Sequence, residues 1–433
     1  MERSHISELK DKQKAMISGF LEESRILSKV AFLIVRDVTG KIQCVIKSDD
    51  SKNFELAKKI NKESIVSIIG KINVSKQAMN GMELMVEKIE VLSESDAQLP
   101  IPVVEKGDVI TALNKRFDYR MLDLRKEKNI LMFKVATSFE KGLREYWNSN
   151  GYIEIHTPKI IGAASESGSE VFMLPYFGKE AFLAQSPQFY KQMALCSGFE
   201  KVFEIGTVFR AENSHTTRHL TEIVMIDMEL AFIKDHFEIM DEEERAIKHA
   251  LEIVKSEYGK EIKEVFGQSI NSSKKFPRIS FKEANDIIKK MGGEPEKDDL
   301  TSAGEKLLGE WALKEHGSDF VFVYNYPWAK KPFYHMKDSK DMNTTKGFDL
   351  IYKGCEITTG SQREHRYEVL KAQAMEKNGN LIGIEDYVNF FKYGAPEHGG
   401  LAIGQARFIQ LLLGLENVRE ATFIPRDPER ITP

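Results

Sequence analysis

Apolar and polar residues alternate over several short stretches in the first 100 residues. In the stretch 41–47, Ile42, Cys44 and Ile46 take every second position, which is typical of a strand with one buried face. Four more short apolar stretches predict strands, and one stretch with helical spacing predicts a short helix. The strands are expected at 14–21, 30–37, 63–74 and 82–92, and the helix at 51–60.

Five strands with a helix between the third and the fourth are the element order of an OB-fold barrel. We therefore predict an OB-fold β-barrel over residues 1–100, with basic and acidic residues in nearly equal number. Pro100 and Pro102 then break the periodicity. The segment 101–125 is accordingly interpreted as a linker or hinge.

Beyond residue 126 the spacing changes to that of amphipathic helices. Over 129–147, Ile130, Phe133, Val135 and Phe139 are the expected buried side chains of a long helix. A second helix is expected over 242–259, ending at Gly259, because glycine favours a helix C-terminus. In the second helix, Ile247, Leu251 and Val254 share one face.

Strands are expected between these helices, without the regular strand–helix alternation of a parallel α/β sheet. Ser280 is the expected N-cap of another helix, followed by the strand at 319–328 and a hairpin over 347–362. Residues 126–433 are therefore predicted to form one α+β domain on an antiparallel sheet.

Composition adds little to this picture. The 433 residues are 42% hydrophobic, with a formal net charge of −4, and they include no apolar run long enough to span a membrane. Cys44, Cys196 and Cys355 lie far apart in the sequence, and this spacing suits free thiols in a reducing cytoplasm.

The predicted hairpin at 347–362 carries a pair of acids. With Lys353-Gly354 as the two-residue turn, Asp349 faces Thr358 directly and shares one face with Glu356. Two converging carboxylates suit a hard cation such as Mg²⁺, which takes one or two carboxylates together with phosphate oxygens. The alternative is a pair of solvated acids on an exposed hairpin.

A predicted strand ends at Arg210, and a polar loop with Arg218 and His219 follows it. The planar guanidinium of Arg210 suits a phosphate or carboxylate ligand. The alternative is a salt bridge between Arg210 and Glu212, two residues further on. No Ser-His-Asp or Cys-His set can be assembled from the sequence, so covalent catalysis by a side chain is not indicated.

Two further segments have an ambiguous pattern. Gln188 and Lys191 lie three residues apart at the start of a predicted helix. The glycine-rich segment 398–408 contains Gly404 and Arg407, and it fits either a phosphate-binding loop or a tight turn before a helix.

Taken in order, these segments resemble the aspartyl branch of the class II aminoacyl-tRNA synthetases, in the archaeal and eukaryotic form with an N-terminal anticodon-binding domain. Residues 151–160 match motif 1, whose Pro158 would lie at the dimer interface of the family. Residues 203–229 match motif 2, and residues 399–413 match motif 3. The resemblance covers nearly the whole chain and implies a cytoplasmic homodimer.

The resemblance also implies roles for individual residues. ATP would contact Arg210, Glu212, Arg218, His219, Glu356, Gly404 and Arg407, and Arg210 and Arg407 would be catalytic. Mg²⁺ would be held by Asp349, Glu356 and Thr359. L-aspartate would contact Glu166, Gln188, Lys191, Arg210, Asp227, Thr359 and Arg363. Phe32 would stack on an anticodon base and Gln43 would read one.

Lys191 separates the two nearest branches of the family, since the asparaginyl pattern does not keep this lysine. With Arg363 it would present two positive charges to a substrate carboxylate, which an amide would leave poorly compensated. The expected partner is tRNA(Asp), and the sequence leaves open whether tRNA(Asn) is charged as well. The alternatives are an asparaginyl enzyme and a catalytically altered paralogue.

Three positions depart from the family pattern: Ala406 replaces an acid of motif 3, Ala402 replaces a glycine, and Ile223 replaces a phenylalanine. The missing acid leaves open what would hold Arg407 in place.

Overall fold

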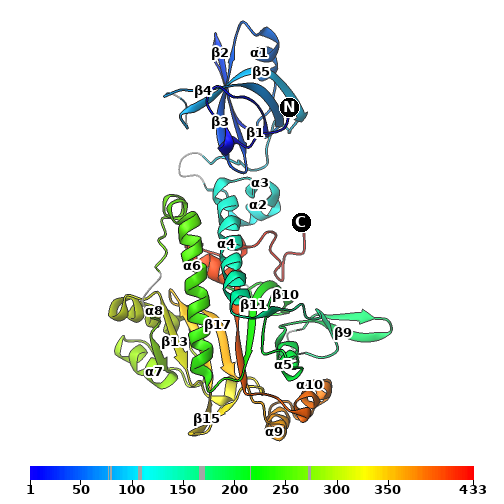
Figure 1. The fold of residues 1–433 in the computed structure, drawn as a ribbon, viewed down its shortest axis with the longest axis vertical. Helices are drawn as coiled ribbons and strands as arrows, with labels where there is room; N and C mark the ends of the chain where they lie inside the picture. Colours follow the sequence, from blue (N-terminus) through cyan, green and yellow to red (C-terminus); the bar gives the residue numbers. More distant parts are fainter. Residues whose placement is uncertain (77, 79, 106–109, 165–170, 215, 272–274) are drawn as a thin grey trace. The chain divides into compact units, whose positions relative to one another are not determined.

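The computed structural model describes residues 1–76, 78, 80–105, 110–164, 171–214, 216–271 and 275–433. The chain divides into two compact units, Met1–Lys126 and Glu127–Pro433 (Figure 1). Within the described ranges, no helix is long and apolar enough to cross a membrane.

The first unit contains a closed five-stranded barrel in the order β1-β2-β3-β5-β4. Alternate side chains point inward, and Leu33 and Cys44 in its core are fully buried. The predicted order, with one helix between the third and fourth strands, is confirmed. The elements are β1 (Lys14–Ile26), β2 (Val30–Asp37), β3 (Gly40–Lys47), α1 (Ser51–Ala57), β4 (Ile65–Val74) and β5 (Met82–Ser93).

Two short helices, α2 (Leu113–Asp118) and α3 (Arg120–Asp123), follow the barrel within the first unit. Between them the fully buried carboxylate of Asp123 binds Arg116 at 2.9 Å and Arg120 at 2.7 Å. Lys126 also lies 3.1 Å from Asp123. The segment expected to be a linker thus contains a buried ionic cluster.

The second unit is built on an eight-stranded sheet in the order β12-β13-β16-β17-β18-β11-β10-β6. Its six central strands pair antiparallel, as predicted, and the edge strands β12 and β6 pair parallel with their neighbours. The strands are β6 (Ile153–Glu154), β10 (Lys201–Phe209), β11 (Glu222–Ala231), β12 (Arg278–Ser280), β13 (Phe320–Tyr324), β16 (Gly347–Tyr352), β17 (Cys355–Gln362) and β18 (His398–Gly404).

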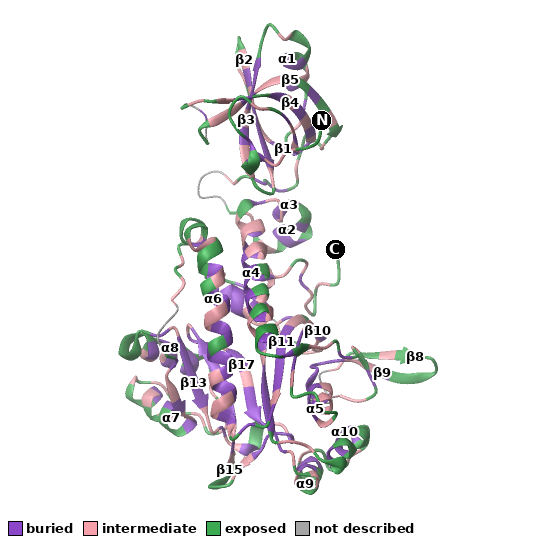
Figure 2. Ribbon diagram, in the orientation of Figure 1, coloured by how far each residue is buried: buried purple, intermediate pink, exposed green. Residues whose placement is uncertain are grey.

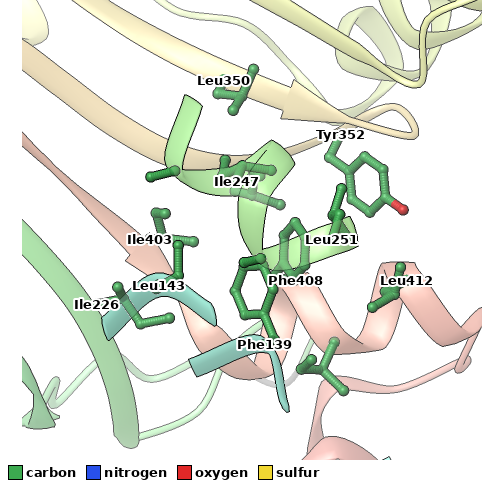
Figure 3. Close-up of a cluster of buried hydrophobic side chains, with 14 of the residues drawn as sticks. Phe139, Leu143, Ile226, Ile247, Leu251, Leu350, Tyr352, Ile403, Phe408 and Leu412 are labelled. Atoms are coloured by element: carbon green, nitrogen blue, oxygen red, sulfur yellow. The ribbon is translucent and has the colours of Figure 1, made fainter. Parts of the chain in front are cut away.

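Helices α4 (Glu127–Ser149), α6 (His236–Phe266) and α11 (Gln405–Leu413) cover one face of this sheet. Their apolar side chains and those of the sheet form the main core, in which Phe139 stacks on Phe408 with 4.2 Å between ring centroids (Figure 3). Val135 is buried in the same core, whereas Ile130 and Phe133 are half-buried. The buried sheet and the exposed outer sides of the helices are evident in Figure 2.

The other face of the sheet carries α5 (Gln188–Cys196), α7 (Phe281–Lys290) and α8 (Ser302–His316). Ser280 caps α7 as its position predicts: its hydroxyl accepts from the Glu283 backbone nitrogen, and its own backbone nitrogen donates to the Glu283 carboxylate. The remaining elements are β7 (Ile160–Ile161), β8 (Met173–Tyr176), β9 (Lys179–Leu183), β14 (Lys337–Asp338), β15 (Asp341–Thr345), α9 (Tyr367–Asn378) and α10 (Glu385–Phe390).

The prediction that a helix ends at Gly259 is wrong. Gly259 lies inside α6, which continues to Phe266 and is capped by Gly267, where φ is 67°. An interior glycine costs a helix about 1 kcal/mol relative to alanine. Continuation of the helix buries Ile262 completely, and burial of a side chain of this size contributes about 2 kcal/mol.

Candidate functional site

One row of paired residues crosses the sheet on the face opposite α4 and α6. Glu204 pairs with Asp227, Asp227 with Ala402, Ala402 with Thr359, and Thr359 with Asp349. Residues paired across neighbouring strands point to the same face. With strands about 4.8 Å apart, the row separates Asp227 from Asp349 by roughly 14 Å.

The register at the hairpin corrects one expectation. Lys353 and Gly354 form the turn with φ of 48° and 75°, as predicted, but Asp349 pairs with Thr359 and not with Thr358. A β-bulge inserts one residue into β17 after Glu356. Thr358 consequently turns to the core face, and Thr359 turns to the face that carries Glu356.

Glu356 and Thr359 lie on the same face of the sheet as Asp349. The Thr359 hydroxyl donates to Glu356 Oε1 at 3.2 Å, and Lys331 Nζ lies 3.1 and 3.3 Å from the two oxygens of Asp349. Burial and the charge of Asp349 raise the pKa of Glu356 to about 7.

The described residues contain no group of three or more His, Cys, Asp or Glu side chains that could hold a metal ion. The oxygen set of Asp349, Glu356 and Thr359 nevertheless fits Mg²⁺, which keeps several waters and binds one or two carboxylates together with substrate phosphates.

Arg407 follows Gly404, the N-cap of α11, and reaches back over the sheet. Its Nη1 donates to the backbone oxygen of Glu356 at 3.0 Å, and its Nη2 donates to that of Arg218 at 3.3 Å. These carbonyl groups hold Arg407 where Ala406 provides no acid, and they leave its charge without a paired carboxylate among the described residues.

The loop between β10 and β11 brings Arg210, Glu212, Arg218 and His219 to the same end of the sheet. Arg210 and Glu212 approach only to 3.9 Å, which makes their ion pair weak. Arg218 Nη1 instead donates to Glu305 Oε2 of α8 at 3.0 Å. Burial and the charge of Arg407 lower the pKa of His219.

A cleft lies between this loop, β17 and the start of α11. Six predicted residues line it: Arg210, Arg218, Glu356, Thr359, Gly404 and Arg407. The three departures from the family pattern, Ile223, Ala402 and Ala406, line the same cleft. Three arginines around one concave site attract a polyanion such as a nucleotide triphosphate.

A second cluster is buried on the same face of the sheet, around Asp227 and Glu229 of β11. Lys191 of α5 is fully buried, and its Nζ lies 2.8 Å from Asp227 and 3.3 Å from Glu229. The nitrogen also donates to the backbone oxygens of Met228 and Leu401. Burial raises the pKa of Asp227, and the charge of Lys191 only partly offsets this effect.

Arg363 and Gln188 complete the buried cluster. Arg363 binds Glu229 at 2.8 Å, Ser361 Oγ at 2.7 Å and Gln188 Oε1 at 3.0 Å. Burial would raise the pKa of Glu229, but the charges of Arg363 and Lys191 outweigh it and lower this pKa. Gly400 pairs with Glu229, and a side chain there would collide with its carboxylate.

The structure corrects the electrostatics expected for this pocket. Two cations, Lys191 and Arg363, face two anions, Asp227 and Glu229, so the pocket is balanced and has no excess positive charge. Glu229 is a residue that sequence reasoning missed. Its position two residues after Asp227 on one strand is the signal that could have found it, because such residues share a face.

The predicted anticodon contacts lie in the first unit. Phe32 and Gln43 lie on adjacent strands of the barrel, both half-buried, and point outward on one face next to Val45 and Ile34. They are therefore available to a ligand on that face. Glu166 lies outside the described residues.

Each of the two units matches a known protein family. Residues 112–428 match the family model of class II tRNA synthetases (D, K and N), and residues 14–92 match that of the OB-fold nucleic acid binding domain. The aspartate–tRNA(Asp) ligase of Pyrococcus abyssi is 42% identical over 434 residues, covering 99% of this chain and 98% of that protein.

A second relative, the aspartate–tRNA(Asp/Asn) ligase of Aeropyrum pernix, is 41% identical and spans 97% of this chain and 96% of that protein. Among solved structures, the asparaginyl-tRNA synthetase of Pyrococcus horikoshii complexed with asparaginyl-adenylate superimposes with a TM-score of 0.93 at 33% identity, covering 100% of both chains. Given these matches over nearly its whole length, the chain belongs to the class II tRNA synthetases of the D, K and N group.

Proposed function

We propose that the chain is an aspartate–tRNA ligase that activates L-aspartate with ATP and Mg²⁺ and transfers it to tRNA(Asp). The observation that carries the proposal is an arginine-lined cleft and a buried Lys191–Arg363 cluster, which follow one another along the central strands on one face of the sheet. The relative from Pyrococcus abyssi has this activity in its name.

In this proposal the cleft binds ATP. Arg210 and Arg407 would contact the α-phosphate from opposite sides, while Arg218 and His219 would lie near the outer phosphates. The chain's work is then to position the substrate carboxylate for in-line attack on the α-phosphorus and to stabilise the negative charge that develops there. Glu212 would accept a hydrogen bond from adenine.

The acid pair would hold Mg²⁺ through Asp349 and Glu356, with Thr359 beside them. When bound, the ion supplies charge neutralisation to the phosphates. The Thr359 hydroxyl positions the Glu356 carboxylate by donating a hydrogen bond to it.

The buried cluster would select the side chain of aspartate. Lys191 and Arg363 are donors without any acceptor atom, and a substrate carboxylate would share them with Asp227 and Glu229. The amide nitrogen of asparagine would place a donor against these donors. Asparagine would therefore bind more weakly than aspartate. Gln188 and Asp227 would orient the two cations, and the assignment of Glu166 to the substrate ammonium stays a prediction.

A homodimer is also part of the proposal. Ile153 and Ile160, which flank Pro158 in motif 1, are 49% and 47% exposed, and a partner would bury these apolar side chains. Measurement of the molar mass in solution would distinguish a dimer from a monomer.

The proposal is tested by pyrophosphate exchange with ATP, Mg²⁺ and either aspartate or asparagine. Exchange with aspartate is expected, and exchange with asparagine alone would replace the proposal by its alternative. That alternative, an asparaginyl enzyme, is favoured by the close superposition on the Pyrococcus horikoshii structure. Charging of purified tRNA(Asp) and tRNA(Asn) in parallel would then show whether both are substrates, as the name of the Aeropyrum pernix relative says of that protein.

A further inference from the structure

A buried lysine lies on the acid pair. Lys331 follows the short 3₁₀ helix Trp328–Lys330 and is 8% exposed. Its Nζ contacts both oxygens of Asp349, at 3.1 and 3.3 Å. A cation of the chain itself therefore occupies the carboxylate that is proposed to hold a divalent ion.

The position of Lys331 is fixed by its surroundings. Its ammonium group lies 3.9 Å from the centroid of the Tyr326 ring, close enough for a cation–π contact. Its backbone nitrogen donates to the oxygen of Trp328 at 3.2 Å. These contacts place the ammonium group beside Asp349 independently of any ligand.

A divalent ion on Asp349 would approach this ammonium group closely. Both share the same two carboxylate oxygens, and in a buried site the repulsion between two cations is weakly screened. The ion must therefore either displace Lys331 from Asp349 or bind next to it with reduced affinity. Loss of the lysine would remove this competition.

We propose that Lys331 is a built-in competitor of the divalent cation at Asp349, a positioning residue that keeps the metal affinity of the nucleotide-free site low. The inference rests on the proposed metal site at Asp349 and Glu356. Its consequence is that the metal is retained mainly when ATP phosphates add oxygen ligands, since the chain alone offers a carboxylate that is already paired.

The test is a titration of the nucleotide-free full chain with Mn²⁺, in which free Mn²⁺ is followed by electron paramagnetic resonance. Lys331→Met is expected to bind Mn²⁺ about tenfold more tightly than the unmodified chain, because the competing charge is gone. Lys331→Arg keeps the charge and serves as the matched control, with an affinity close to that of the unmodified chain. Asp349→Asn is expected to weaken binding.

Thermal unfolding provides a second readout that tolerates partial destabilisation. Without Mn²⁺, Lys331→Met is expected to melt below the unmodified chain, because Asp349 is left buried without its partner. Mn²⁺ should then raise the melting temperature of the variant more than that of the unmodified chain, because a ligand that binds more tightly stabilises the folded state more.

Equal Mn²⁺ affinity in Lys331→Met and the unmodified chain, with weaker binding in Asp349→Asn, would overturn the competition and leave the proposed metal site intact. Mn²⁺ binding that neither Asp349→Asn nor Glu356→Gln weakens would overturn the metal site itself. The two failures are thereby distinguished.

Discussion

At the scale of single residues, buried charges on the active face are balanced in close pairs. Lys191 faces Asp227, Arg363 faces Glu229, and Lys331 faces Asp349. Each pair is stable only while both members remain, because removal of one leaves an uncompensated charge in a buried site.

Substitution of Lys191 by Met should abolish aspartate activation and also destabilise the second unit by about 3–5 kcal/mol, because Asp227 loses its cation. The double variant Lys191→Met/Asp227→Asn should recover part of the melting temperature without recovering activity. Thermal unfolding and pyrophosphate exchange measure the two effects. If Lys191→Met melted at the same temperature as the unmodified chain, the ion pair between Lys191 and Asp227 would not stabilise the fold.

Glu243 on α6 has no such partner within the described part of the chain. Burial, together with the charge of Asp349, raises the pKa of Glu243 to about 8, although the Thr358 hydroxyl beside it lowers this pKa. The folded chain therefore retains a proton on Glu243 between pH 4.5 and about 8 that the unfolded chain releases. Stability falls as the pH rises through this window and becomes level above it.

Glu243→Gln removes that dependence. The variant should be more stable than the unmodified chain at pH 8.5, by on the order of 3 kcal/mol, and equally stable near pH 4.5. Melting temperatures recorded across this range check the prediction. A difference that grows toward acid would contradict the raised pKa.

At the scale of elements, α8 is fixed to the β16–β17 hairpin by a glycine contact. A side chain on Gly309 would collide with the backbone of Gly354 in the turn. The same helix carries Glu305, whose Oε2 accepts from both Arg218 and the Glu356 backbone nitrogen. The packing of α8 on the hairpin therefore positions two residues of the cleft, and Glu305 was not found from the sequence.

Gly309→Ala should destabilise the chain and weaken ATP binding, although alanine is the better helix former by about 1 kcal/mol. Gly259→Ala is the matched control, since its added methyl group would meet only the flexible side chain of Lys255 at 3.5 Å. This control should raise stability by about 0.5–1 kcal/mol. Melting temperatures and the KM for ATP decide the matter, and equal effects of the two substitutions would refute the contact.

Only part of the β16–β17 hairpin could be predicted from the sequence. Lys353-Gly354 specifies its turn by local chemistry, and the turn was predicted correctly. The bulge that pairs Asp349 with Thr359 was not, because alternation of apolar and polar residues does not encode one inserted residue. The end of α6 was wrongly predicted at Gly259, because the buried residue that prolongs the helix, Ile262, lies beyond this glycine.

At the scale of the whole molecule, the two units divide the proposed work. The cleft and the buried cluster lie in Glu127–Pro433, while Phe32 and Gln43 lie in Met1–Lys126. The order of motifs along the chain was sufficient to predict both folds. Contacts such as Lys331–Asp349 were not predictable, because they join segments whose proximity depends on the tertiary structure.

Substitution of Phe32 by Ala should lower tRNA charging by about 5- to 150-fold, because stacking on one base contributes about 1–3 kcal/mol. Gln43→Ala should have a smaller effect. Pyrophosphate exchange should be unchanged in both variants, since it requires only the second unit. Equal loss of exchange and charging would indicate a folding defect and contradict the assignment of these residues to tRNA.

The order of the two sites along one strand has a consequence for substrate length. On β11 the cleft is lined by Ile223 and Met225, and the buried cluster begins at Asp227, two residues further on. A strand rises about 3.3 Å per residue, and a sheet cannot stretch to fit a longer substrate. If the phosphate lies in the cleft and the substrate side chain meets the cluster, this rise sets the length of the acid. Glutamate, longer by one methylene, would then reach the cleft with its reacting carboxylate out of line.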